Sequence, residues 1–282
     1  VDWLQLVTFV LNDKFAWASW ALTVLREYVV QLQLANPLRD FGYDAWAAMF
    51  WILSVLLLGC VGLCVYVAAD FQRDTFSAVW PVKVVRSVLS LFFSLFFTSS
   101  LNVFLSAISC DYTAATPTLQ GFKTADGLDI PCWGGGHAVY AVVGILMAIL
   151  FIAISAVLTM VDFDRDFRSR NPLAMPSSRP EFWIFVCKLM FTVCSVLLGQ
   201  FHVALSISYF VLSALMTYQT ARFLPFLRGW VNVLKGTLYA LLCFEAASAI
   251  AVSVINDGSI EAPSIAAFTA FPVVVGLAVL LL

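Results

Sequence analysis

The chain has 282 residues, of which 62% are hydrophobic and 11% are charged, against about 25% charged residues in soluble domains. Its formal net charge of −2 excludes a protein that binds nucleic acid through a basic surface. Five stretches have no charged residue, and each could cross a membrane, since about 20 helical residues span about 30 Å of hydrocarbon. The sequence therefore predicts an all-α, polytopic transmembrane helical bundle. The stretches are 45–69, 87–109, 138–161, 203–221 and 262–282.

In chain order we predict about eight membrane segments, forming a single transmembrane domain over 1–282. The first and last segments read as truncated, because 1–11 resembles the second half of an apolar helix and Leu282 lies inside an apolar run. We therefore expect these residues to be the membrane portion of a longer chain with a cytoplasmic C-terminal region. The segments are 1–11, 45–69, 82–109, 137–161, 181–199, 201–223, 231–255 and 263–282.

Residues 15–34, between the first two segments, carry Trp17, Trp20, Arg26 and Glu27 among apolar residues. Charges near the centre disfavour a membrane span, whereas Trp and Arg are common at headgroup depth. An interfacial or re-entrant helix is the favoured interpretation, and a true span is the alternative.

The distribution of Lys and Arg predicts the orientation, because cytoplasmic loops carry an excess of these residues. The predicted segments leave ten basic residues on one side and four on the other, with Lys188 inside a segment. The side with ten is assigned to the cytoplasm. The smaller set is Lys14, Arg26, Arg39 and Lys123, and the larger set is Arg73, Lys83, Arg86, Arg165, Arg168, Arg170, Arg179, Arg222, Arg228 and Lys235.

Two cysteines, Cys110 and Cys132, bracket the longest outer loop. Cysteines on a non-cytoplasmic face, at the ends of neighbouring segments, predict a disulfide. Closing this loop would stabilise the fold by about 3–4 kcal/mol on the chain-entropy model; two unrelated free thiols are the alternative. The other cysteines lie in apolar runs and are interpreted as small hydrophobic residues. They are Cys60, Cys64, Cys187, Cys194 and Cys243.

Neither a metal nor a cofactor is predicted. The two histidines, His137 and His202, lie at the outer ends of segments, where they are interpreted as polar caps. A metal site would need more ligands, and the nearest candidates are Cys132 and Asp129. The chain has no phosphate-binding loop, serine-hydrolase elbow or zinc-protease helix, so no catalytic residue is assigned and no enzymatic activity is expected.

Two charged side chains, Lys188 and Glu245, lie within predicted segments, and intramembrane charges are functional hypotheses by default. Lys188 follows Glu181 by seven residues, about 10 Å at 1.5 Å per residue, so it can extend back to the headgroups. Glu245 follows Lys235 by ten residues and lies near mid-bilayer, where an isolated carboxylate is very costly. It is either a polar contact that fixes helix packing or a proton- or cation-responsive residue, and its pairing with Lys188 stays open.

A polar stripe runs along the third segment, because its polar residues fall within an arc of about 120° at about 100° per residue. The stripe could line an aqueous path. Ser, Thr and Asn more often bond to a neighbouring helix or to their own backbone, and this is the favoured interpretation. Gly59 and Gly62 in the second segment likewise predict close helix approach. The stripe residues are Ser87, Ser90, Ser94, Thr98 and Asn102.

The inner loop 162–181 contains three prolines that forbid a continuous helix, and Glu181 directly after Pro180 suits the start of the next helix. The loop is interpreted as a salt-bridged elbow beside the membrane that could also dock a cytoplasmic domain. The basic and proline positions assigned to this elbow are Arg168, Arg170, Pro172, Pro176 and Arg179.

The elbow sequence Arg-Ser-Arg-Asn-Pro-Leu-Ala-Met-Pro-Ser-Ser-Arg at 168–179, between apolar helices, resembles the membrane region of the tiny macrocysts family. The segment Asn-Pro-Leu-Arg at 36–39 and the outer cysteine pair are also similar. The resemblance implies a continuation into cytoplasmic PAS domains and no catalytic residue in the membrane part.

The first functional hypothesis is a non-enzymatic membrane module that anchors or couples PAS-type sensory domains to a plasma or ciliary membrane. Its expected partners are the lipid bilayer, other membrane subunits or a second copy, and cytoplasmic domains of the same chain; nucleic acid is not expected. The alternative is a channel or transporter subunit whose cation path is lined by the polar stripe and Glu245, although no internal repeat supports it. A structural subunit of a membrane assembly is the second alternative.

Overall fold

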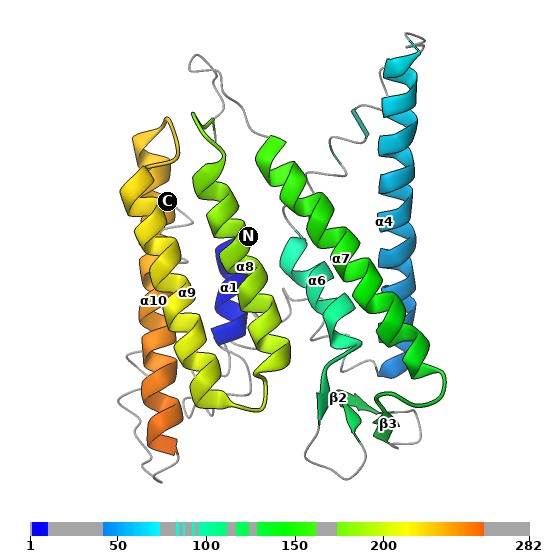
Figure 1. Cartoon of the computed structure of the whole chain (residues 1–282). Coiled ribbons are helices and arrows are strands. Elements are labelled where there is room, and N and C mark those ends of the chain that lie inside the picture. Colours follow the sequence, from blue (N-terminus) through cyan, green and yellow to red (C-terminus); the bar gives the residue numbers. More distant parts are fainter. Residues whose placement is uncertain are drawn as a thin grey trace. The chain divides into compact units, whose positions relative to one another are not determined.

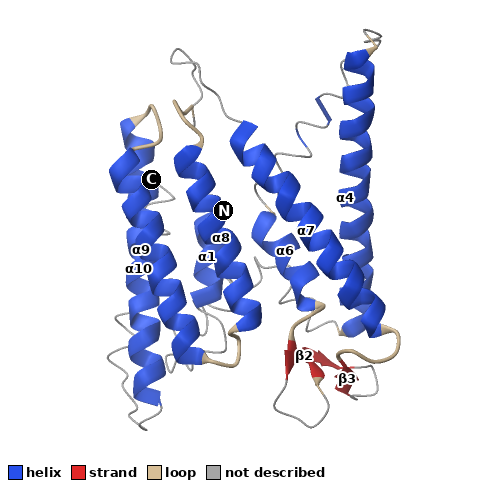
Figure 2. Ribbon diagram, in the orientation of Figure 1, coloured by secondary structure: helices blue, strands red, loops and turns tan. Residues whose placement is uncertain are grey.

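The computed structural model describes residues 2–10, 42–73, 83–84, 87, 92–93, 96–111, 117–123, 129–161 and 174–256. These residues are mainly helical, as Figure 2 shows, with one small sheet. They divide into two compact units: unit 1 is 1–33 with 159–282, and unit 2 is 34–158. The single domain expected from the sequence stays a prediction.

Five helices in the described part of the chain are long and apolar enough to cross a membrane. They agree with the second, fourth, fifth, sixth and seventh predicted segments, so the membrane protein inferred from composition is supported. The eight segments are not confirmed, because the last of them, 263–282, lies outside the described residues. The separate interfacial stretch 15–34 also lies outside them. The five candidate spans are Tyr43–Asp70, His137–Val161, Arg179–Leu197, His202–Phe223 and Gly229–Ala251.

The first and third predicted segments are described only as short helices. Helix α1 covers Asp2–Val10, and nine residues at 1.5 Å each reach about 14 Å, roughly half a bilayer core. In the third segment, helix α6 covers Phe97–Ser106, so a continuous helix over 82–109 is not confirmed.

Unit 1 contains three long helices that follow one another in the chain (Figure 1). The turns between them are short, so neighbouring helices run antiparallel. The short α1 packs against two of them, α8 and α10. The three helices are α8 (Arg179–Leu197), α9 (His202–Phe223) and α10 (Gly229–Asn256).

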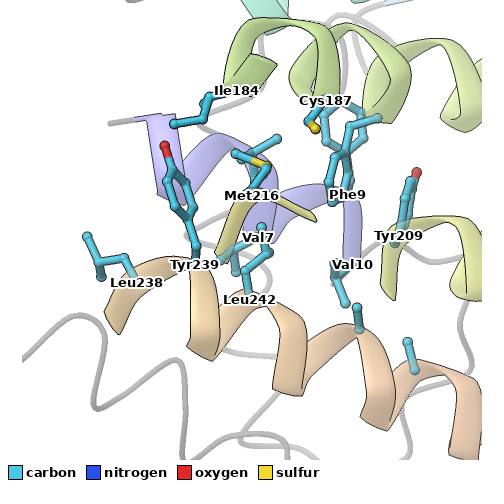
Figure 3. Packing of buried hydrophobic residues seen from close by; sticks show 14 of the residues in the cluster. Val7, Phe9, Val10, Ile184, Cys187, Tyr209, Met216, Leu238, Tyr239 and Leu242 are labelled. Atoms are coloured by element: carbon cyan, nitrogen blue, oxygen red, sulfur yellow. The ribbon is translucent and has the colours of Figure 1, made fainter. Parts of the chain in front are cut away.

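The core of unit 1 is built around aromatic rings contributed by three helices. Phe9 of α1 lies 6.4 Å from the ring of Phe191 and 6.2 Å from the ring of Tyr209, centroid to centroid, and the last two rings stack at 4.9 Å. Figure 3 shows Val7 and Val10 of α1 in the same cluster as Leu242 of α10. α1 therefore completes an apolar core that the three long helices share.

Unit 2 contains α4 (Tyr43–Gln72), α6 and α7 (His137–Val161). The first residues of α4 and α7 meet, since the Tyr43 hydroxyl lies 3.0 Å from Nδ1 of His137. The Trp46 indole donates a hydrogen bond of 2.7 Å to the Ser106 hydroxyl at the end of α6. The start of α4, the end of α6 and the start of α7 therefore share one end of this unit, as alternating membrane spans require.

The loop between α6 and α7 folds into a three-stranded antiparallel sheet in the order β1-β2-β3, so the all-α prediction is wrong here. Cys110 pairs with Leu119, and Thr118 pairs with Pro131. The backbone of a loop outside the helices still needs hydrogen-bond partners, and the pairing of strands supplies them. The strands are β1 (Cys110–Asp111), β2 (Thr118–Lys123) and β3 (Asp129–Pro131).

A disulfide joins Cys110 of β1 to Cys132, directly after β3, with their Cα atoms 6.0 Å apart. The disulfide predicted from the sequence is therefore confirmed. The other five cysteines are free thiols, as their apolar surroundings in the sequence indicated.

The close helix approach predicted at Gly59 and Gly62 is not found among the described residues, since a Cβ at either position would meet no atom within 4 Å. The close approach occurs instead at Gly144 of α7. A Cβ there would lie 3.0 Å from both the Cβ of Ala107 and the backbone oxygen of Phe104. Gly144 therefore permits a close contact between α7 and the end of α6, and any larger residue at this position would push the two apart.

Replacing Gly144 with Ala should lower the stability of unit 2, because the new methyl group must displace the backbone of α6. We expect a loss of about 1–3 kcal/mol, the usual cost of inserting a methyl group into a packed core. Gly62→Ala is the matched control, and it should leave stability unchanged or raise it slightly, since Ala is the better helix former. Unfolding of both variants in detergent micelles measures the difference; equal effects would contradict the contact.

Candidate functional site

The acid Glu245 lies inside unit 1, with only 1% of its surface exposed. Two contacts define how α10 aligns with α9: the hydroxyls of Ser206 and Ser253 are 3.2 Å apart, and Thr220 lies against Gly236. Between these contacts the antiparallel register places Glu245 at the level of Ser213. The carboxyl group is therefore held in the middle of a helical hairpin, far from either end.

Both carboxyl oxygens of Glu245 lack a hydrogen-bond partner among the described residues. The hydroxyl of Ser213 donates to the backbone oxygen of Phe210 (3.0 Å). A buried carboxylate without compensation costs several kcal/mol. The position therefore requires a proton, a cation or a donor from outside the described contacts, and it can act as a binding site for one of these.

The ion pair between Lys188 and Glu245, left open by the sequence, is not formed in this structure. The stacking of Phe191 on Tyr209 aligns α8 with α9, and this register brings half-buried Lys188 to about the same level as Glu245. The carboxyl oxygens of Glu245 nevertheless make no hydrogen bond with any described residue, Lys188 included. The two charges thus share a level of the bundle without a direct bond.

Hydroxyl groups inside the candidate spans mostly donate to their own helix backbone three or four residues earlier. This is the interpretation favoured for Ser and Thr in apolar helices. In the polar stripe, Thr98 and Asn102 are buried and Ser87 is exposed, while Ser90 and Ser94 lie outside the described residues. Examples of the backbone bonds are Ser54 to Phe50, Thr192 to Lys188, Thr217 to Ser213 and Thr220 to Met216.

One end of unit 1 is tied by contacts between the elbow and the α9–α10 turn. The backbone N–H of Leu227 donates to the oxygen of Ala174 (3.1 Å). The Lys235 ammonium donates to Oε1 of Glu181 (2.7 Å) and lies 4.4 Å from the ring centroid of Phe226. We call these five residues the inner clamp, and it joins the start of α8 to the start of α10.

The α9–α10 turn is itself held in one conformation. Leu224 ends α9 with a left-handed backbone (φ 41°), and Pro225 follows, which prevents the helix from continuing. The side chain of Asn232 accepts from the N–H of Phe226 (2.9 Å) and donates to its oxygen (2.8 Å). The turn therefore presents a fixed backbone to the elbow.

The elbow is described from residue 174 onward, so its prediction as a salt-bridged element stays a prediction. α8 begins at Arg179 with Pro180 in its first turn, and Glu181 forms the ion pair of the inner clamp. Pro176 and Arg179 are exposed. The remaining predicted elbow residues, Arg168, Arg170 and Pro172, lie outside the described residues.

His137 has both ring nitrogens engaged in unit 2. Its Nε2 lies 3.0 Å from the backbone oxygen of Ala107, which can only accept, so Nε2 carries the hydrogen and Nδ1 accepts from Tyr43. His202 is exposed at the start of α9. Among the described residues no group of three or more His, Cys, Asp and Glu could hold a metal ion. Tyr43 and His137 are 94 residues apart in the chain, so no local sequence pattern predicts their hydrogen bond.

Comparison with known proteins gives two matches. Tiny macrocysts protein C of Dictyostelium discoideum is 25% identical over 282 residues, and tiny macrocysts protein B of the same organism is 23% identical over 280 residues. Each alignment covers 97% of this chain. The chain is homologous to the tiny macrocysts proteins. It spans 19% of the length of each of these relatives.

The family resemblance stated from the sequence is thereby confirmed, over 97% of the chain. No family model matches the chain. No solved structure matches it either.

Replacing Glu245 with Leu should raise the free energy of unfolding by about 1–3 kcal/mol, because a buried polar group without partners is exchanged for an apolar one of similar size. Leu242→Ala, one turn earlier on the same helix, is the control and should lower stability by about 2–5 kcal/mol. Both are measured by unfolding in micelles. A loss of stability in Glu245→Leu would show that the carboxyl group is a structural contact.

The ion pair of the inner clamp should show as coupling between Lys235 and Glu181. Because both side chains are only partly exposed (25% and 16%), we expect a coupling energy of about 1 kcal/mol, at the upper end for exposed pairs. A double-mutant cycle with Lys235→Met and Glu181→Gln measures it. Strictly additive losses would mean that the pair contributes nothing.

Proposed function

We propose that this chain is a non-enzymatic, multi-pass membrane module that anchors cytoplasmic sensory domains and couples them to the membrane. The observation that carries the proposal is the inner clamp. It ties the elbow between α7 and α8 to the α9–α10 turn, so a force applied at the elbow acts on two membrane helices together. Small shifts of packed helices are a common means of transmitting a signal.

The relatives support a modular role. This chain aligns with 19% of the length of tiny macrocysts proteins B and C, so in those proteins the matched region is attached to a much longer remainder. The proposal that the attached domains are of PAS type rests on the family resemblance. The membrane is proposed to be a plasma or ciliary one, with the inner clamp and the C-terminal side in the cytoplasm.

A channel or transporter subunit is the second candidate, and the buried Glu245 is the observation that favours it. A carboxyl group without a partner at mid-helix is a feature of proton and cation pathways. Of the polar stripe that was to complete the path, only Ser87, Thr98 and Asn102 are among the described residues. The anchoring module stays the first proposal because the inner clamp and the relatives both support it.

A crosslinking experiment tests the anchoring function. A cysteine at the exposed elbow position Pro176, treated with a bifunctional thiol reagent in native membranes, should give a product that contains a cytoplasmic sensory domain, identified by peptide mass spectrometry. Trp133, exposed after β3 in the loop predicted to be non-cytoplasmic, is the control site and should give none. Arg179→Glu should reduce the product at Pro176. Equal yields at both sites would contradict the proposal.

Flux measurements separate the two candidates. In proteoliposomes that contain the chain, we expect fluxes of H⁺, Na⁺ and K⁺ equal to those of empty vesicles. A flux above that level which Glu245→Gln abolishes, with the protein still folded, would assign the chain to the channel class.

A further inference from the structure

The end of unit 1 that carries the inner clamp also carries exposed arginines and tryptophans. Arg179 begins α8, Arg222 lies in the last turn of α9, and Arg228 immediately precedes α10; all three are exposed. Trp183 and Trp230 are 54% and 61% exposed. The contact between Leu227 and Ala174 shows that these segments share one end of the unit. We call these five residues the basic–aromatic rim.

The described residues at this end leave a positive charge. Lys235 and Glu181 neutralise each other in the inner clamp. The other acidic residues described in unit 1 are Asp2, which begins α1, and Glu245, which is buried in mid-helix. Neither lies in the elbow or the α9–α10 turn. The three arginine charges of the rim therefore have no compensating carboxylate among the described residues of these two segments.

Two helix N-termini add to this positive field. α8 and α10 both begin at this end, with 19 and 28 residues, and the first N–H groups of a helix favour an anion. The residue that precedes α8, Ser178, makes no side-chain cap bond, and Asn232 in the first turn of α10 is engaged with Phe226. The N–H of Arg179 bonds to the Ser177 hydroxyl (3.3 Å), Pro180 has no N–H, and the N–H of Val231 bonds to the oxygen of Arg228 (3.1 Å). The two helix starts therefore contribute through their dipoles.

The guanidinium of Arg222 is held in a position in which it can bind an anion. It donates to the Tyr218 hydroxyl (2.7 Å) and lies 5.7 Å and 5.4 Å from the ring centroids of Tyr218 and Phe223. A guanidinium has five N–H donors in a fixed fork. One bond to Tyr218 orients the group and leaves donors for a phosphate.

We propose that the basic–aromatic rim binds the phosphate headgroup of an anionic phospholipid. The occupant is a lipid because the arginines lie among exposed apolar side chains at the ends of candidate spans, including Phe223 and Leu224, and because Trp is enriched at headgroup depth. Basic residues beside a membrane attract anionic lipids by about 1 kcal/mol each. The rim thereby selects lipid by charge, independently of whether the chain couples sensory domains.

Native mass spectrometry of the purified chain in neutral detergent tests this proposal. Phosphatidylserine should bind at least tenfold more tightly than phosphatidylcholine. The double variant Arg222→Gln/Arg228→Gln should weaken phosphatidylserine binding roughly thirtyfold, since each arginine contributes about fivefold. Arg222→Lys/Arg228→Lys, which keeps both charges, should retain binding within about fivefold, and the melting temperatures of both double variants show that the protein is folded.

Arg73→Gln is the matched control, because Arg73 is an exposed arginine after α4 in unit 2, also on the predicted cytoplasmic side. It should leave binding unchanged. Equal affinities for the two lipids, or an equal loss in Arg73→Gln, would overturn the rim as the site. Full competition by millimolar inorganic phosphate would overturn the lipid as the occupant and assign a site for the free anion.

Discussion

Hydrocarbon offers the polypeptide backbone no hydrogen-bond partner, and most of this structure follows from that constraint. A charge-free stretch can enter a bilayer only as a helix that pairs its own amides and carbonyls, and the five candidate spans do so. Even hydroxyls within them, such as those of Ser54 and Thr220, turn to their own backbone. Strand pairing, the disulfide and the described ion pair all lie at helix ends. The first two are in the sheet of unit 2, and the ion pair is in the inner clamp of unit 1.

The long helices could be predicted because their limits are set by local signals. Charges and prolines end the apolar runs, and α7 coincides with the predicted 137–161. The sheet could not be predicted in the same way, since β2 depends on partners on both sides in the chain. Glycine shows the same limit: a Cβ at Gly144 would meet α6, whereas a Cβ at Gly62 would meet no atom of the described residues within 4 Å. Only the facing helix distinguishes the two positions.

The residues of the candidate site could be identified from the sequence, but their contacts with one another could not. Glu245 stood out as an acid in an apolar run, yet the absence of a hydrogen-bond partner for it among the described residues depends on side chains from other helices. The prolines marked the elbow, but Glu181 meets Lys235 across 54 residues, a pairing that no spacing encodes. The family resemblance, by contrast, could be stated from short motifs, and the alignments with the relatives cover 97% of the chain.

Whether the long helices of unit 1 cross a membrane is tested most directly at the two ends of α8. Ser177 lies just before this helix and exposed Phe201 lies just after it, with about 28 Å of helix between them at 1.5 Å per residue. Single cysteines at these positions are labelled in intact cells with a membrane-impermeant maleimide. Labelling of the Phe201→Cys protein alone, with Ser177→Cys reacting only after permeabilisation, is the predicted result. Equal labelling of both in intact cells would contradict the membrane crossing.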